Sequence, residues 1–144
     1  MLLEMLLVVA ITDGDTIKVL DSQNQQLKVR LASIDAPERK QPFGTKSKQM
    51  LAELIGNKRV NLDCPKKGRY QRQICTITLN GVDINREMVA RGGAWVYRQY
   101  YKGTDYLEIE SNAKSNHIGL WKTSEYQAIP PWEWRKSKRK AKQN

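Results

Sequence analysis

Five short extended runs, each ended by a turn or a polar loop, constrain the fold of this chain most strongly. The clearest run extends from Leu27 to Leu31, where apolar and basic residues alternate. A period of two is typical of a half-buried strand, and it predicts that Arg30 points away from the buried face. The dipeptides Asp13-Gly14 and Asn80-Gly81 favour tight turns. The strands predicted in this way cover residues 6–11, 16–20, 27–31, 59–64 and 73–79.

Three further segments have the periodicity of helices. In the segment Thr45 to Ile55, apolar residues recur on one side and Gly56 follows as a stop signal. The other two predicted helices are Asn85 to Arg91 and Tyr106 to Asn116. A helix after the third strand and two helices after the fifth predict an α+β fold, a closed five-stranded β-barrel with three packed helices.

The charge of the chain is strongly basic and unevenly distributed. Its 25 Lys and Arg residues exceed its 15 Asp and Glu residues by 10. Such an excess favours a polyanionic partner, because basic side chains release counterions when they neutralise phosphates. However, residues 135–144 hold six of the basic side chains and no acidic one. A solubilising tail explains this cluster equally well, and we expect these ten residues to be disordered.

A set of five charged residues stands out from this background. It contains Asp15 in a turn, Arg30 on a strand, Asp35 and Glu38 in the next loop, and Arg72 beyond a basic loop. Hydrolysis of a phosphodiester needs a base for water, a cation on the phosphate and donors for the developing charge. Two Asp, one Glu and two Arg residues can supply these functions without histidine. Scattered charges on a surface are the simpler explanation of their spacing alone.

The motifs around these residues are more specific than their spacing. Asp13-Gly14-Asp15-Thr16, the segment Arg30 to Glu38, and Arg69-Tyr70-Gln71-Arg72 resemble the staphylococcal-nuclease-like (thermonuclease) family in order and spacing. Later motifs resemble its bacterial secreted-type members, namely the segments 80–85, 93–95, 119–121 and 130–132. The resemblance extends from about Val8 to Trp134. It implies an OB-fold barrel and a nuclease domain over residues 1–134.

The resemblance also implies roles for individual residues. Asp15 and Asp35 would be carboxylate ligands of a Ca²⁺ ion, which prefers hard oxygen donors, and Ala36 would add its backbone carbonyl. Glu38 would act as general base or order the attacking water. Arg30 would hold the scissile phosphate with a forked guanidinium that Lys cannot copy.

Further residues would bind the substrate. The resemblance implies that Arg72 also holds the scissile phosphate, that Arg69 and Tyr70 contact a neighbouring phosphate, and that Tyr100 lines the nucleotide pocket. One position departs from the family, because Gln71 stands where the family usually has Gly. If that position needs a positive φ, a Gln there costs about 1 kcal/mol and could displace Arg72.

Several other residues have structural explanations. His117 follows the third predicted helix, where a cation favours the helix dipole, and it has no histidine partner for catalysis. Glu110 lies on the apolar side of that helix and is expected to be buried and hydrogen-bonded. Counting from the loop between their strands, Cys64 and Cys75 are offset by about two residues. This offset favours free thiols, whereas a bulge in the loop would allow a disulfide.

The function predicted from these observations is a Ca²⁺-dependent endonuclease. It would cut DNA and RNA with little sequence preference, leave 3′-phosphate ends and act as a monomer. The alternative is an OB-type module that binds single strands without cutting them, and a third hypothesis is a protein-interaction domain. The apolar residues 1–11 are too few to cross a membrane and predict a strand rather than a secretory leader. The compartment stays open, with a slight preference for secretion or the periplasm.

Overall fold

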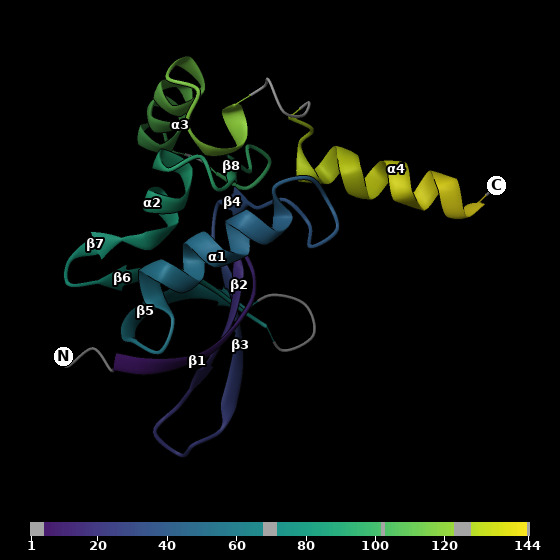
Figure 1. Cartoon of the computed structure of the whole chain (residues 1–144). Helices are drawn as coiled ribbons and strands as arrows, with labels where there is room; N and C mark the ends of the chain where they lie inside the picture. Colours follow the sequence, from purple (N-terminus) through teal and green to yellow (C-terminus); the bar gives the residue numbers. More distant parts are fainter. Residues whose placement is uncertain (1–4, 68–71, 102, 123–127, 144) are drawn as a thin grey trace.

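A closed mixed β-barrel forms the centre of this computed structural model, which describes residues 5–67, 72–101, 103–122 and 128–143 (Figure 1). Its five strands are paired in the order β3-β2-β1-β5-β6, and a parallel pairing of β3 with β6 closes the barrel. These strands are β1 (Met5–Asp13), β2 (Thr16–Leu20), β3 (Gln26–Leu31), β5 (Arg59–Lys67) and β6 (Gln73–Leu79). The barrel predicted from the alternating pattern is therefore confirmed.

Three shorter strands complete the pairing. The strand β7 (Val82–Asp83) extends the sheet from β6, while β4 (Ile34–Asp35) and β8 (Trp95–Val96) form a separate antiparallel pair. Each of these three strands has only two residues, which explains why no periodic pattern marked them in the sequence. The β4–β8 pair matters for function, because Asp35 lies in it opposite Trp95.

The described residues form four α-helices, not the three expected. The predicted helices are α1 (Gly44–Ile55), α2 (Ile84–Ala90) and α3 (Asp105–Ser115), and a 3₁₀ turn, η2 (Gly119–Trp121), follows α3. The fourth helix, α4 (Pro131–Gln143), covers most of the segment expected to be a disordered tail. Pro at its first position and good helix formers such as Lys and Arg favour a helix there. None of the described helices is long and apolar enough to cross a membrane.

The main core lies inside the barrel and under α1 and α2. Ile17, Val29 and Ile77 from the strands and Leu51 and Ile55 from α1 are fully buried. A second cluster joins the helices to the C-terminal part, and it contains Trp95, Ala113, Leu120 and Trp121 with Trp132 packed against them. Trp95 and Trp121 belong to this core, with exposures of 8% and 6%.

The two cysteines form a disulfide, so the preference for free thiols was wrong. Asp63 pairs with Thr76, and the next residues, Cys64 and Cys75, therefore lie directly opposite each other with their Cα atoms 4.1 Å apart. Between Asp63 and Lys66 the register shifts. A count from the middle of the loop misses this irregularity, because it assumes regular pairing on both sides.

Candidate active site

The site begins at the hairpin turn between β1 and β2. The backbone N–H of Asp15 donates to Asp13 Oδ1 at 3.1 Å, and the Thr16 hydroxyl donates to Asp15 Oδ1 at 2.9 Å. A β-carbon at Gly14 would lie 1.8 Å from Ser47 Oγ, so only glycine lets this turn approach α1. The Asp15 carboxylate is thereby held in a buried position, with 5% of the residue exposed.

The neighbouring strand β3 brings Arg30 to this carboxylate. Because Thr16 pairs with Arg30 in the β2–β3 ladder, the guanidinium lies beside the turn that holds Asp15. Arg30 Nη1 is 3.1 Å from Asp15 Oδ2, and Arg30 Nη2 is 3.4 Å from Asp35 Oδ1. One arginine therefore contacts both predicted metal ligands, which places their carboxylates on either side of a single guanidinium.

The segment after β3 returns Asp35 and Ala36 to the same place. Ser33 has a φ of 71°, which turns the chain sharply before β4. Pairing of β4 with β8 then fixes the fully buried Asp35, and the N–H of Ala36 donates to Asp15 Oδ2 at 2.7 Å. Asp15, Arg30, Asp35 and Ala36 thus come together from three separate points of the chain.

A compact loop before α1 positions Glu38. Its backbone N–H donates to Gln41 Oε1 at 3.0 Å, and its carbonyl accepts from the Gln41 N–H at 2.9 Å. A β-carbon at Gly44 would lie 1.9 Å from the Glu38 carbonyl oxygen, so glycine is needed for α1 to begin directly under the loop. This packing fixes the tight loop between the two prolines and thereby the position of Glu38.

Arg135 of α4 also lies in the site, and the sequence analysis missed it. Its guanidinium contacts both oxygens of Asp35, at 3.1 Å from Nη1 and 2.6 Å from Nη2, and Nη1 donates to Glu38 Oε1 at 2.7 Å. No periodic pattern in residues 135–144 points to Arg135, and that segment was expected to be disordered.

The surroundings of three aspartates at this site shift their pKa values. Burial raises the pKa of Asp13 to about 8, and the nearby Asp15 carboxylate adds to the rise. Burial opposes ionisation of Asp15 as well, but Arg30 and several hydrogen bonds hold the pKa of Asp15 below its ordinary value. Burial raises the pKa of Asp35, although Arg135 and Arg30 favour its charged form. Buried carboxylates that repel one another favour binding of a cation.

The oxygen atoms of this site are the kind of ligand that a hard divalent cation prefers, but the two carboxylates alone are too few to fill its coordination shell. Within the described ranges, no group of three or more His, Cys, Asp or Glu side chains is placed to hold a metal ion. Asp15 and Asp35 provide two carboxylates whose oxygens are brought together by Arg30. Ca²⁺ takes 6 to 8 oxygen ligands, so such an ion would need backbone carbonyls and water besides these two groups.

The predicted substrate-binding residues are only partly described. Arg72 directly precedes β6, which pairs with β3 at Arg30, and Arg72 Nε is buried without a hydrogen-bond partner among the described residues. Arg69, Tyr70 and the unusual Gln71 lie outside the described residues. Tyr100 is 62% exposed and packs edge-on against Tyr97.

Comparison with known proteins identifies the family of this chain. Residues 28–123 match the family model described as staphylococcal nuclease homologue. The chain belongs to this family. The matched segment contains four of the five charged residues predicted from the sequence, and Asp15 lies before it.

Bacterial relatives share most of their length with this member of the nuclease family. An uncharacterized endonuclease of Haemophilus influenzae is 44% identical over 132 residues, covering 92% of this chain and 73% of that protein. A micrococcal nuclease of Shigella flexneri is 39% identical over 145 residues, covering 93% and 82% respectively. An uncharacterized endonuclease of Escherichia coli O157:H7 is 38% identical over 132 residues, covering 91% and 84%.

Other expectations can be compared directly with the structure. Glu110 is buried and accepts from the N–H of Val96 at 2.6 Å and from Arg98 at 2.7 Å, which confirms its structural role. His117 is exposed after α3 and adopts a φ of 53°. Trp132 docks the C-terminal segment, since its ring stacks on Tyr97 with the ring centroids 5.4 Å apart.

Proposed function

We propose that this chain is a Ca²⁺-dependent endonuclease that hydrolyses DNA and RNA with little sequence preference and leaves 3′-phosphate ends. The observation that carries the proposal is the Arg30 guanidinium, which contacts Asp15 and Asp35 beside the loop of Glu38. Membership of the staphylococcal nuclease family supports a phosphodiester as the substrate. Relatives named endonuclease and micrococcal nuclease support the same reaction.

Asp15, Asp35 and the carbonyl of Ala36 are the groups that would hold the cation. When bound, Ca²⁺ supplies positive charge that stabilises the phosphate oxygens as negative charge builds on them. The buried position of the two carboxylates excludes bulk water from this part of the site. Low exposure strengthens their attraction for a cation, because solvent screens buried charges less.

The chemical step requires one base and two donors. Glu38 accepts a proton from the attacking water, whose oxygen forms a bond to phosphorus as the bond to the 5′ oxygen breaks. The leaving 5′ oxygen then takes a proton from solvent water, and the phosphate stays on the 3′ side. Arg30 and Arg72 donate to the non-bridging oxygens, where two forked guanidinium groups stabilise the charge of the transition state.

The remaining predicted residues would bind substrate outside the scissile bond. Arg69 and Tyr70 would contact a neighbouring phosphate, and the exposed ring of Tyr100 would pack against a base. Base stacking is tolerant of sequence because each base presents a π face. Phosphate contacts likewise carry no sequence information, so this mode of binding accounts for low specificity.

Plasmid DNA and RNA incubated with Ca²⁺, and separately with excess chelator, test the proposal. We expect cleavage in the presence of Ca²⁺ and none in excess chelator, with 3′-phosphate ends on the products. The variant Asp35→Asn should lose most of the activity and retain the fold. Undiminished cleavage in chelator would contradict the role of the metal. Binding of single strands without cleavage under any condition would instead favour the non-catalytic binding module.

A further inference from the structure

Arg135 makes the two shortest ion pairs of the candidate active site, at 2.6 Å and 2.7 Å. It donates to both oxygens of Asp35 and to Glu38, so one guanidinium joins a proposed metal ligand to the proposed base. Its side chain is 32% exposed, compared with 1% for Asp35. Among the described residues, no other hydrogen bond or ion pair holds the Glu38 carboxylate. The arginine therefore governs which interactions these two carboxylates can make.

The docking of α4 aims this arginine into the site. Three residues before Arg135 on the same side of the helix, Trp132 stacks on Tyr97 with an angle of 4° between the rings, and it meets Trp95 edge-on at 5.7 Å. Before the helix, the carbonyl of Ile129 accepts a hydrogen bond from Gln41 Nε2 at 2.5 Å. The ring contacts thus hold the first turn of α4 against Trp95 and Tyr97, and the Gln41 bond holds the residue before the helix against the loop that carries Glu38.

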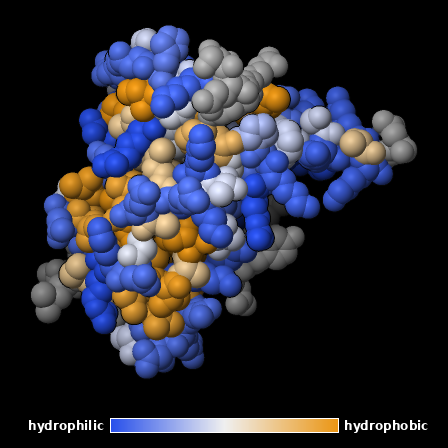
Figure 2. Space-filling view, viewed as in Figure 1, coloured by the Kyte–Doolittle hydropathy of each residue, from blue (hydrophilic) through white to orange (hydrophobic). Residues whose placement is uncertain are grey.

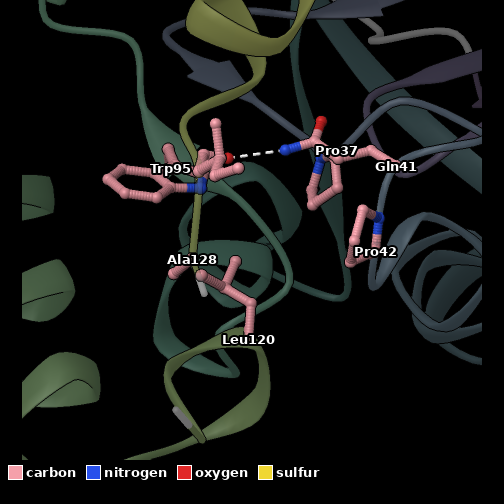
Figure 3. Close-up of a pocket in the computed structure, with 7 residues that line it drawn as sticks. Pro37, Gln41, Pro42, Trp95, Leu120 and Ala128 are labelled. Carbon is pink, nitrogen blue, oxygen red and sulfur yellow. Dashed lines mark hydrogen bonds between the residues drawn. The ribbon is translucent and has the colours of Figure 1, made fainter. Parts of the chain in front are cut away.

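The interface between the C-terminal segment and the rest of the protein is closely packed beside these contacts. Figure 3 shows the Gln41 amide reaching across to the backbone of the C-terminal segment, with Trp95 nearby. The small pocket drawn there is lined by residues of both sides, namely Pro37, Gln41, Pro42, Trp95, Leu120, Ala128 and Ile129. This packing makes the position of Arg135 a feature of the fold rather than that of a free surface side chain.

The charges around Asp35 indicate how Arg135 affects the binding of a divalent cation. Three carboxylates, those of Asp15, Asp35 and Glu38, face two guanidinium groups, those of Arg30 and Arg135. If Arg135 leaves, the net charge of this group becomes more negative by one unit, and both oxygens of Asp35 lose a donor. A divalent cation that takes an oxygen of Asp35 must therefore replace a charge-assisted hydrogen bond and overcome repulsion from a fixed cation.

We propose that Arg135 is a further residue of the active site, which competes with the divalent cation for Asp35 and at the same time holds the proposed base, Glu38. Arg30 is a poorer competitor, because it contacts Asp35 only at 3.4 Å and is also held by Asp15 and by the Leu31 carbonyl. Metal binding and docking of Arg135 then oppose each other. This inference rests on the proposed metal-dependent function.

Calorimetric titration of Ca²⁺ into the protein without nucleic acid tests the competition. Arg135→Gln should bind Ca²⁺ about tenfold more tightly than the wild type, a difference of about 1.4 kcal/mol. Arg135→Lys keeps the charge but loses the forked donor geometry, and its affinity should lie between the two. Circular dichroism and thermal unfolding check that each variant keeps the fold.

Arg139→Gln is the matched control, because it removes the same charge from an exposed position of the same helix. Its Ca²⁺ affinity should stay within about twofold of the wild type, since exposed charges are largely screened. Equal or weaker binding by Arg135→Gln, or equal tightening by Arg139→Gln, overturns the inference while the proposed function stands. Absence of Ca²⁺ binding in both the wild type and Arg135→Gln overturns both proposals.

Discussion

At the scale of single residues, the role of Glu38 as general base is the part of the proposed chemistry that a substitution can test most directly. Its carboxylate, 35% exposed, is held by Arg135 rather than by its own loop, whose hydrogen bonds involve only the backbone of Glu38. Glu38→Gln should lower the cleavage rate by about 10²- to 10⁴-fold, the range for a lost general base. Single-turnover kinetics on plasmid DNA measure this loss. Glu53→Gln, an exposed change on α1, should cut at the wild-type rate.

The substitution Arg30→Lys tests the donor geometry of the guanidinium, because it keeps the positive charge. Its two terminal nitrogens contact Asp15 and Asp35 separately, and a lysine has only one such nitrogen. Arg30→Lys should therefore cost about 10²-fold or more in kcat, because bidentate donation to the transition state is lost. Arg59→Lys on the exposed face of β5 is the control. Near wild-type cleavage by Arg30→Lys would remove Arg30 from the catalytic residues.

Glu110 joins α3 to β8 inside the fold. It accepts from the buried N–H of Val96, and Arg98 and Lys114 neutralise its charge. Glu110→Ala leaves that N–H without an acceptor and should lower the free energy of unfolding by about 3 kcal/mol. Denaturant titration measures the change, and Glu108→Ala, exposed on the same helix, should change it by less than about 0.5 kcal/mol. Equal effects of the two substitutions would contradict the structural role.

Local pattern explains which residues of the site could be predicted. Asp15 and Arg30 come together because β2 pairs with β3, whereas Asp35 lies on β4 outside the barrel and was predicted from the motif that resembles the family. Arg135 reaches the same carboxylates from about 100 residues away, through the packing of Trp132. Such a contact depends on tertiary packing and leaves no periodic signal.

At the scale of elements, α4 combines a docked first turn with a projecting basic end. Figure 1 shows the helix leaving the body near β4, and Figure 2 shows mainly hydrophilic residues along it. After Arg135 it carries five further basic side chains, at positions 136, 138, 139, 140 and 142. Those at 136, 138, 139 and 140 are exposed, and they can contact the phosphates of a bound strand beside the site.

Removal of Lys136 to Asn144 should weaken binding of nucleic acid and reduce its dependence on salt, because fewer counterions are released. Turnover at saturating substrate should persist, since Arg135 and the carboxylates remain. A full-length variant with Lys138→Gln, Arg139→Gln and Lys140→Gln keeps the helix and should show the same trend. Loss of turnover in this variant at saturating substrate, with the fold unchanged, would contradict a role limited to binding.

At the scale of the whole molecule, the disulfide joins strands at the point where the barrel closes. Cys75 is fully buried in β6, pairs with Leu31 of β3, and accepts a hydrogen bond at its carbonyl from the Ala32 N–H. Its bond to Cys64 of β5 therefore links β5 to the strand that completes the barrel. The fold class followed from alternation along each strand, whereas this bond depends on a local register shift that alternation does not encode.

Reduction of this bond should destabilise the barrel measurably. The bridge closes a short loop, with a sequence separation of 11, and a cross-link of that span restricts the unfolded chain by about 3 kcal/mol. For a domain of this size, that loss corresponds to a fall in Tm of roughly 10 °C. Cys64→Ala with Cys75→Ala should show a similar fall without reductant, and reductant should not change its Tm further. The mass of the unreduced wild type should be lower by two protons than that of the reduced form. Equal masses, or a Tm unaffected by reductant, would show that the barrel closes without the bond. The backbone pairing of β3 with β6 would then be the interaction that keeps the barrel closed.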